Sequence, residues 1–282
     1  LRMRLCVSGR NLSDGIRGVT VDNVNKTLYI PLYGKAYVSR KGIILHDAKA
    51  EEIWSLEGFS LKGKSKSKWL AYYMGMRSKV FDNWVKEQMV RCEDALVLHI
   101  GCGMDSRVLR VKTREHMWYD IDFPDVIAER KKYYTESETY KMIAGDARET
   151  AWLPLLPKDK KAIVVMEGIS MYLQIEETQK LLKELGEHFK TVHLLVDVYT
   201  EFAAKASKIK NPINEVGVTD VTGIDDPMVL CDKTGFDFVA KCEMTPQHLI
   251  DELTGLEKGI FKTMYAGSIA DKTYRLYEYV KK

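Results

Sequence analysis

Short apolar runs alternate with amphipathic stretches from Ala95 onward, and this alternation restricts the possible folds more than any other feature of the chain. Short strands separated by helices are typical of βαβ units, which build a parallel sheet with helices on its faces. The expected strands are 95–100, 117–121, 141–143, 162–166 and 192–196, and the expected helices are 126–134 and 175–189. The pattern predicts an α/β fold with a doubly wound, mostly parallel sheet.

The remaining segments depart from this pattern. Residues 273–280 (TYRLYEYV) alternate in polarity and predict a late strand at the end of the sheet. Residues 201–246 include a GIDDP turn and an aperiodic stretch, so we expect an insertion over the rim of the sheet. Residues 1–92 predict helices, most clearly from Trp69 to Met89, where apolar residues recur at helical spacing. We therefore expect a helical segment, 1–92, that packs on an α/β core, 93–282.

The composition is that of an ordinary globular protein, with 45% hydrophobic and 29% charged residues. A net charge of +3, with acids interleaved among the basic residues, argues against nucleic acid as a partner. The apolar runs are too short to span a membrane, and the first residues lack the apolar core of a signal peptide, so we expect a cytoplasmic protein. The five cysteines lie far apart, without a histidine at metal-ligand spacing, so we expect no metal site.

The strongest local motif is 95–107 (ALVLHIGCGMDSR), an apolar strand that runs into a glycine turn and a helix start. Gly101 and Gly103 let a ligand approach the backbone closely, because a Cβ atom there would occupy the space of the ligand. A dinucleotide-binding dehydrogenase would carry a third glycine where this chain has Ser106. A GxG pair is also compatible with a simple tight turn, with Asp105 or Ser106 as the N-cap of the helix.

Acidic residues follow the next three expected strands. Asp122 ends the second strand, Asp146 follows the third beside Ala147, and Glu167 follows the fourth. An acid at the end of the second strand can accept hydrogen bonds from the ribose hydroxyls of an adenosine; Asp120, on the same strand face, is the alternative. Because the carboxyl ends of the strands meet at one edge, these acids predict a pocket for a ligand with hydroxyl and amino groups.

Two basic residues fall within apolar helical patterns in the first segment. Arg77 lies inside the apolar stripe of the helix 69–89, and Lys35 lies three residues after Leu32. A buried cation needs an anion, because desolvating an unpaired charge is costly. The anion can be a ligand or a carboxylate of the protein itself, and the pattern leaves both open.

Several motifs resemble one known family, the leucine carboxyl methyltransferases, and within it the bacterial branch of polyketide carboxyl O-methyltransferases. They are GxGxDxR after the first strand, DFPxVI after the second, AGD after the third and EGxxMYL after the fourth. The resemblance extends upstream through residues 27–54 and the helix that carries Arg77, and so covers nearly the whole chain. It implies a methyltransferase that uses S-adenosylmethionine and a small-molecule carboxylate or hydroxyl as the methyl acceptor.

Carried over residue by residue, the resemblance also implies a cofactor site. Lys35 and Arg77 would bind the carboxylate of the methionine moiety. Gly101, in the turn from Gly101 to Gly103, would line the methionine moiety. Asp122 would hold the ribose. Asp146 and Ala147 would face the adenine, and Glu167 would lie near the amine and the sulfonium.

Other functions stay open at this point. A protein methyltransferase acting on a C-terminal carboxylate is the alternative within the class. A nicotinamide-dependent dehydrogenase and a non-catalytic cofactor-binding protein are alternatives from other classes. No residue has a convincing pattern for a general base, since His99 lies on a strand expected to be buried. The pattern predicts neither an oligomeric state nor the identity of the acceptor.

Overall fold

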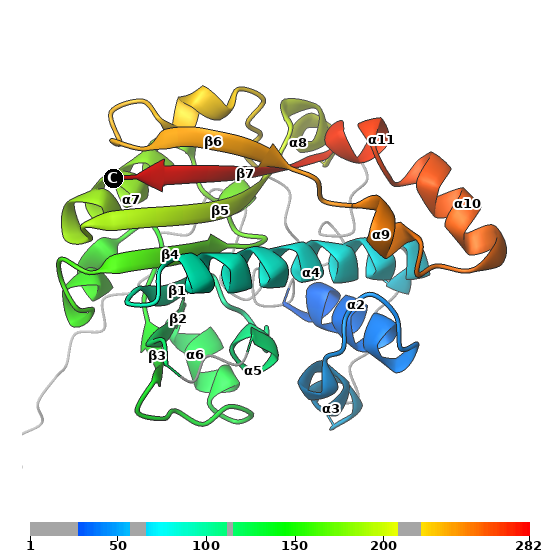
Figure 1. The fold of residues 1–282 in the computed structure, drawn as a ribbon, viewed down its shortest axis with the longest axis horizontal. Helices are drawn as coiled ribbons and strands as arrows, with labels where there is room; N and C mark the ends of the chain where they lie inside the picture. Colours follow the sequence, from blue (N-terminus) through cyan, green and yellow to red (C-terminus); the bar gives the residue numbers. More distant parts are fainter. Residues whose placement is uncertain (1–27, 57–65, 112–114, 208–220) are drawn as a thin grey trace, which may run out of the picture.

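A seven-stranded sheet forms the centre of the protein in the computed structural model, which describes residues 28–56, 66–111, 115–207 and 221–282 (Figure 1). The strand order is β3-β2-β1-β4-β5-β7-β6. Strands β1 to β5 are parallel, and β7 runs antiparallel between β5 and β6. The strands are β1 Leu96–Ile100, β2 Trp118–Asp122, β3 Tyr140–Ala144, β4 Lys161–Met166, β5 Thr191–Tyr199, β6 Asp237–Cys242 and β7 Tyr274–Lys281. The predicted α/β sheet and its late strand are confirmed.

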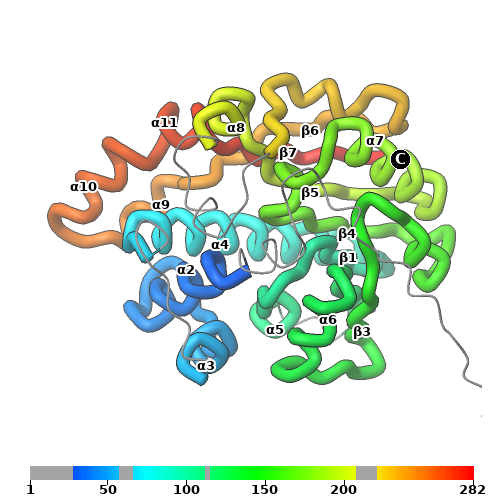
Figure 2. Tube along the Cα trace, turned by 180° about the vertical axis from the view of Figure 1, so that it is seen from behind, coloured from blue at the N-terminus to red at the C-terminus, as the bar shows by residue number. Residues whose placement is uncertain are grey.

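Helices cover both faces of the sheet, with α4, α5 and α6 on one face and α7 on the other (Figures 1 and 2). The α-helices are α2 Tyr29–Arg40, α3 Ala48–Leu56, α4 Lys68–Arg91, α5 Arg107–Val111, α6 Pro124–Arg130, α7 Ile175–His188, α8 Glu201–Ser207, α9 Gln247–Ile250, α10 Gly255–Met264 and α11 Ser268–Asp271. Short 3-10 turns are η2 Thr150–Leu155, η3 Ser170–Tyr172 and η5 Pro227–Leu230.

The central strands read as continuous apolar runs because both of their faces are covered. On β4, Ile163 and Val165 belong to the core on the α4 side, whereas Val164 and Met166 belong to the core on the α7 side. Parallel strands flanked by helices on both sides have this character. The apolar runs in the sequence therefore identified β4 and its neighbours correctly.

Strand β6 lies inside the segment expected as an insertion, 201–246, and its strand character was not predicted. Its residues alternate between exposed and half-buried, because β6 is the edge strand of the sheet and pairs on one side only. A register shift between Phe238 and Ala240 weakens the period further. The same segment also contains α8 and η5, and its residues 208–220 lie outside the described part of the chain.

The helices α2 and α4 pack closely against each other, and α4 packs on the sheet. A Cβ atom at Gly34 would lie 2.8 Å from Met74 Cβ, and one at Gly75 would lie 2.8 Å from Val38 Cγ2. Small residues at both contacts let the two helix backbones approach. On α2, the buried Lys35 reaches Asp105, which follows the glycine turn after β1.

The sheet has its topological switch point between β1 and β4, which lie side by side although their connections leave in opposite directions. In open α/β sheets, ligands bind outside the carboxyl ends of the strands at this point. Among the described helices, none is long and apolar enough to cross a membrane.

Candidate functional site

A cavity of about 710 Å³ opens at the carboxyl ends of β1, β2, β3 and β4 and extends beneath α2, α4, α10 and α11. All eight residues predicted to hold a cofactor line it: Lys35, Arg77, Gly101, Gly103, Asp122, Asp146, Ala147 and Glu167. The structure thus gathers residues from six separate segments around one space of the size that small-molecule sites have.

The glycine turn after β1 forms the floor of this cavity. Gly101 has φ +71° and Gly103 has φ +50°, a conformation that side chains with a Cβ atom rarely adopt. A Cβ atom at Gly101 would lie 2.0 Å from Ile169 Cγ2. Both the backbone conformation and the close approach of Ile169 therefore require glycine at position 101.

Asp120 is buried within β2, whereas Asp122, at the end of the strand, is half-buried and lines the cavity. Its carboxylate accepts hydrogen bonds from the amides of Gly103 (2.7 Å) and Phe123 (2.8 Å). Burial raises the pKa of Asp122 to about 6, although these two amides act in the opposite direction. The carboxylate is thus held at the cavity edge, with the Gly103 amide as a direct link to the glycine turn.

Asp120 is fully buried and serves a different role. It forms an ion pair with Arg130 (2.5 Å) and accepts hydrogen bonds from Trp118 Nε1 (2.7 Å) and Tyr140 (2.6 Å). Burial opposes its ionisation, but Arg130, His99 and Tyr140 together outweigh this effect and lower the pKa of Asp120 to about 2. Asp120 is thus paired within the protein, which favours Asp122 over Asp120 as the acid for the ribose hydroxyls.

Asp146 lies just after β3 and forms an ion pair with its neighbour Arg148. The Arg148 Nε atom lies 2.9 Å from both carboxylate oxygens of Asp146, and Nη2 lies 2.5 Å from Oδ2. The preceding glycine is required, since a Cβ atom at Gly145 would lie 2.3 Å from Trp152 Cδ1. Trp152 in turn donates a hydrogen bond to the Asp146 carbonyl at 2.9 Å.

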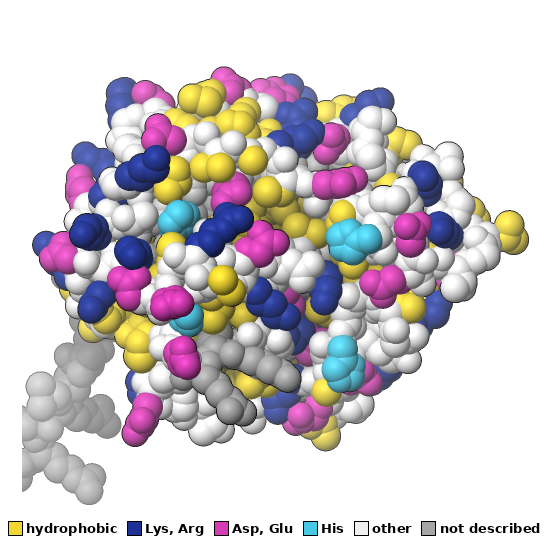
Figure 3. All heavy atoms as spheres, viewed as in Figure 1, with side chains coloured by type: hydrophobic (Ala, Val, Ile, Leu, Met, Phe, Trp, Pro, Cys, Tyr) yellow, Lys and Arg dark blue, Asp and Glu magenta, His cyan; other side chains and the backbone are white. Residues whose placement is uncertain are grey.

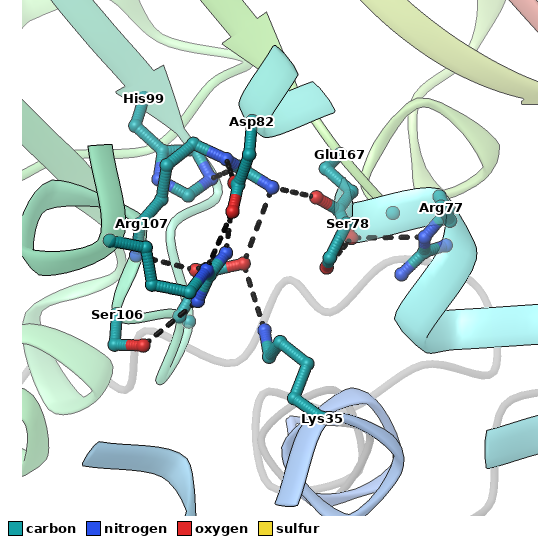
Figure 4. A network of polar contacts seen from close by, with 12 residues as sticks. Lys35, Arg77, Ser78, Asp82, His99, Ser106, Arg107 and Glu167 are labelled. Atoms are coloured by element: carbon teal, nitrogen blue, oxygen red, sulfur yellow. Dashed lines mark hydrogen bonds and ion pairs between the residues drawn. The ribbon is translucent and has the colours of Figure 1, made fainter. Parts of the chain in front are cut away.

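Arg77 is 3% exposed and is bracketed by two carboxylates from the ends of β4 and β5. Its Nε atom donates to Glu167 Oε1 at 3.0 Å, and Nη1 donates to Asp197 Oδ2 at 2.9 Å. Ser78 also donates to Glu167 Oε1, at 2.9 Å (Figure 4). The protein therefore provides counter-ions for Arg77. Its Nη2 atom has no hydrogen-bond partner among the described residues and lies beside Gly168.

Lys35 projects from α2 to the same network, where its Nζ atom lies 2.8 Å from Asp105 Oδ2 (Figure 4). Arg107 lies deeper and is fully buried. It donates to Glu167 and, at 2.7 Å, to Asp82 Oδ1. The arginine occurs in the GxGxDxR motif, yet sequence reasoning assigned it no role. Four cations and their carboxylates thus form one connected charge network at this end of the cavity: Lys35, Arg77, Arg107 and Arg110 with Asp47, Asp82, Asp105, Glu167 and Asp197.

His99 is a buried strand residue, 1% exposed, next to this network. Its Nε2 atom lies 3.3 Å from Arg107 Nη1, and its Nδ1 atom lies 3.6 Å from Asp120 Oδ1. Burial lowers the pKa of His99, and the positive charge of Arg107 lowers it further. A neutral histidine in contact with a guanidinium is a poor proton acceptor.

The other end of the cavity is apolar and aromatic, and sequence reasoning did not predict it. Trp69 and Tyr265 stack there with ring centroids 5.7 Å apart and planes at 11°, and Tyr199 meets Tyr274 edge-on at 4.5 Å. The described residues that line this end carry no charged side chain; they include Trp69, Leu70, Tyr73, Met171, Tyr172, Tyr199, Ala203, Met264, Tyr265, Ile269, Ala270 and Tyr274. They come from seven separate elements, so no local pattern could identify them.

The sheet order and a ligand crevice at the carboxyl ends of its strands define the fold of the class I S-adenosylmethionine-dependent methyltransferases. A solved structure with this fold is the magnesium protoporphyrin IX methyltransferase of Synechocystis PCC 6803 with bound SAH. It matches with a TM-score of 0.50 and 12% identity over 92% of this chain and 100% of that chain.

Within this class, the chain belongs to the leucine carboxyl methyltransferase family, whose model matches residues 22–186. The tetracenomycin polyketide synthesis O-methyltransferase TcmP of Streptomyces glaucescens is 26% identical over 86% of this chain and 91% of its own length. An S-adenosyl-L-methionine-dependent methyltransferase of Gibberella zeae, dpfgK, is 26% identical over 79% of this chain and 82% of its own length. The protein is an S-adenosylmethionine-dependent methyltransferase, and the dehydrogenase hypothesis is wrong.

Proposed function

We propose that this enzyme methylates a carboxylate oxygen of a small, largely apolar and aromatic molecule. The observation that carries the proposal is the division of the cavity into a charged end at the strand rim and an uncharged aromatic end beneath α10 and α11. A polar cofactor fits the first and an aromatic acceptor fits the second, so that donor and acceptor would meet between them.

The residues of the charged end fit S-adenosylmethionine group by group. Gly101 and Gly103 leave room for close approach to the backbone, and Asp122 offers a carboxylate for the ribose hydroxyls. Asp146 and Ala147 would face the adenine. When bound, the cofactor supplies an electrophilic methyl group on a sulfonium.

The groups for the methionine moiety are the cations and the acid of the buried network. Arg77 Nη2 and Lys35 would hold the carboxylate, and Glu167 would lie near the amine and the sulfonium. A guanidinium suits a carboxylate because its N–H groups form a planar fork. The pocket therefore has a complementary group for each polar part of the cofactor.

A carboxylate acceptor suits the aromatic end better than a phenol. A carboxyl group, with a pKa of about 4, is ionised at neutral pH, whereas a phenol, with a pKa of about 10, benefits from a general base. The described residues lining the cavity include one histidine, His99, which is buried against Arg107. Burial also raises the pKa of Tyr73 and Tyr274, so that both stay protonated. An acceptor that is already an anion needs none of them as a base.

The TcmP relative supports the proposal, since its name describes an O-methyltransferase of polyketide synthesis. The chain's own contribution would be to hold the acceptor oxygen in line with the methyl group and to exclude water. Such positioning can contribute about 7–11 kcal/mol to lowering a barrier. In a site with few mobile dipoles, attraction between a carboxylate and a sulfonium is also stronger than in water.

The experiment is a methyl-transfer assay with labelled S-adenosylmethionine and matched acceptor pairs. Each pair consists of an aromatic carboxylic acid and the corresponding phenol, and a peptide with a free C-terminal carboxylate is tested in parallel. The proposal predicts an alkali-labile methyl ester of the aromatic acid, formed at saturating S-adenosylmethionine at a rate that changes little between pH 7 and 8, because a carboxylate acceptor does not titrate in this range. Label found only in the phenol ether contradicts it. Label found only in the peptide favours the protein carboxyl methyltransferase instead.

A further inference from the structure

We propose that Asp197, at the end of β5, is the positioning residue that aims Arg77 at the cofactor. The inference rests on the proposed function, in which Arg77 holds the carboxylate of the cofactor. Asp197 lies outside the family motifs found in the sequence, and it does not line the cavity. It therefore acts on the cofactor through another residue.

Asp197 is fully buried, and each of its carboxylate oxygens has its own partner. Oδ2 accepts a hydrogen bond from Arg77 Nη1 at 2.9 Å, and Oδ1 accepts one from the Gly168 amide at 2.6 Å. Its backbone carbonyl accepts a hydrogen bond from the Ser170 hydroxyl. Asp197 thus connects α4 with the turn that follows β4.

The geometry around Arg77 shows what this connection achieves. Glu167 takes the Nε edge of the guanidinium and Asp197 takes Nη1, so the plane of the group is held from two sides. Nη2 lies next to Gly168, where a Cβ atom would be 3.4 Å away, and it has no partner among the described residues. Because the contacts at Nε and Nη1 fix the guanidinium, Nη2 points in one direction. A ligand carboxylate there would meet a preorganised donor.

The Asp197 carboxylate also fixes the start of the loop after β4, part of which lines the aromatic end of the cavity. Gly168 has φ +74°, and its amide is directed to Asp197. The chain continues through Ser170 to Met171 and Tyr172, which line the aromatic end of the cavity. One buried acid therefore holds both the cation expected at the methionine end and the loop that faces the acceptor.

Burial of Asp197 is costly, which argues that the contacts matter. Burial raises the pKa of Asp197, and the positive charge of Arg77 and the Gly168 amide only partly offset this. An apolar residue would avoid the desolvation cost, because a buried ion pair is seldom the most stable choice for a core position. A role in orienting Arg77 accounts for the acid.

The test is the affinity for S-adenosylhomocysteine, measured by calorimetry on purified variants. Asp197→Asn keeps the size and an oxygen for the Gly168 amide but loses the charge that holds Arg77. We expect affinity about 10- to 100-fold weaker, in the range for a hydrogen bond to a charged group. Glu257→Gln is the control, since Glu257 accepts hydrogen bonds from Lys68 and Tyr72 outside the cavity, and it should leave the affinity unchanged. Unchanged or tighter binding by Asp197→Asn overturns the proposal.

A double-mutant cycle separates positioning from a purely structural role. If Asp197 acts through Arg77, Asp197→Asn should have little further effect on affinity in an Arg77→Met background. Equal effects in both backgrounds would show that Asp197 only supports the fold, and would overturn the proposal. Arg77→Lys, which keeps the charge but not the fork, replaces Arg77→Met if the latter does not fold. If substitution of Arg77 alone leaves the affinity unchanged, the proposed cofactor placement itself is wrong, a result distinct from failure of Asp197→Asn alone.

Discussion

Asp122 and Asp120 stand two residues apart on β2, yet their environments make them different chemical groups. Asp120 is ionised against Arg130, whereas Asp122 has two backbone amides and a pKa raised to about 6. A carboxylate that burial makes hard to ionise is a common feature of functional sites. The contrast indicates a structural role for Asp120 and supports the proposal that Asp122 contacts the ligand.

With Asp122 as the proposed ribose ligand, its raised pKa predicts that cofactor binding depends on pH. Ionised Asp122 accepts charge-assisted hydrogen bonds with both oxygens, whereas the protonated group turns one oxygen into a donor; a raised folded-state pKa means that the group becomes protonated as the pH falls through about 6. We expect the affinity for S-adenosylhomocysteine to fall between pH 7 and 5, as calorimetry would measure. Asp122→Ala should bind about 100-fold more weakly and lose this pH dependence. An identical pH profile in that variant would assign the titration to another group.

At Gly101, the addition of a single Cβ atom should change both the stability of the protein and its affinity for the cofactor. Gly101→Ala places a Cβ atom at φ +71° and against Ile169. We expect a loss of about 1–3 kcal/mol in unfolding free energy, from backbone strain and overpacking, together with loss of cofactor binding. Chemical denaturation and calorimetry measure the two effects.

Gly255→Ala is the matched control for this substitution. Gly255 also has a positive φ, +54°, but no atom lies within 4 Å of the added Cβ. It should show only the strain, about 1 kcal/mol, and normal cofactor affinity. Equal stability losses in the two variants would mean that Ile169 moves aside without cost.

At the scale of elements, α10 closes the aromatic end of the cavity and is attached to the N-terminal helices. Its Glu257 accepts hydrogen bonds from Lys68 (2.7 Å), Tyr72 (2.5 Å) and Lys41 (3.2 Å), while Phe261 and Tyr265 contact Tyr72 and Trp69. The attachment joins residues that lie far apart along the chain. The shape of the acceptor end therefore depends on how firmly α10 is held.

Glu257→Gln should loosen α10 without affecting the cofactor end. We expect amide hydrogen exchange in 255–264 to be about 2- to 5-fold faster, in keeping with the modest worth of partly exposed ion pairs. Glu187→Gln on α7, whose carboxylate lies 3.9 Å from Lys183, should leave this exchange unchanged. Hydrogen bonds from Lys68 and Tyr72 lower the pKa of Glu257 to about 2, so its stabilising effect is present above about pH 4.5 and is lost as the pH falls towards 2. Exchange that is as slow in Glu257→Gln as in the wild type would show that the aromatic stack alone holds the helix.

The elements also show where sequence patterns work and where they fail. The helix predicted at 69–89 is α4, and the predicted buried strands correspond to β1 to β5, because burial on one stripe or on both faces leaves a strong apolar pattern. β6 was missed because an edge strand with half-exposed residues leaves a weak one. Pattern strength follows burial, so it declines towards the edge of the sheet.

For the whole molecule, one hydrophobic cluster joins the N-terminal helices to the sheet. Phe81 and Val85 of α4 belong to it, as do Ile163 of β4 and Leu276 of β7. The proposed cofactor site spans this cluster, with Arg77 from the helical segment and Glu167 from the sheet. A ligand that bridges the two parts should stabilise the molecule as a whole.

A thermal-shift experiment tests this expectation. At 100 times its dissociation constant, a ligand specific for the folded state adds about 2.7 kcal/mol. For a domain of this size we expect S-adenosylhomocysteine to raise Tm by about 5–10 °C and a nicotinamide nucleotide to leave it unchanged. Asp122→Ala, with about 100-fold weaker binding, should rise by only about 1 °C at the same concentration. A rise with the nicotinamide nucleotide would contradict the site assignment.

The sequence by itself determined the α/β class, the glycine turn and the acids at the strand ends, because these depend on local patterns and on the rule that parallel strands end at one edge. Only the tertiary structure separated Asp122 from Asp120, placed Asp197 behind Arg77 and assembled the aromatic end from distant segments. Which carboxylate meets which cation depends on side-chain directions and on the packing of helices far apart in the chain. Such contacts leave no periodic pattern in the local sequence.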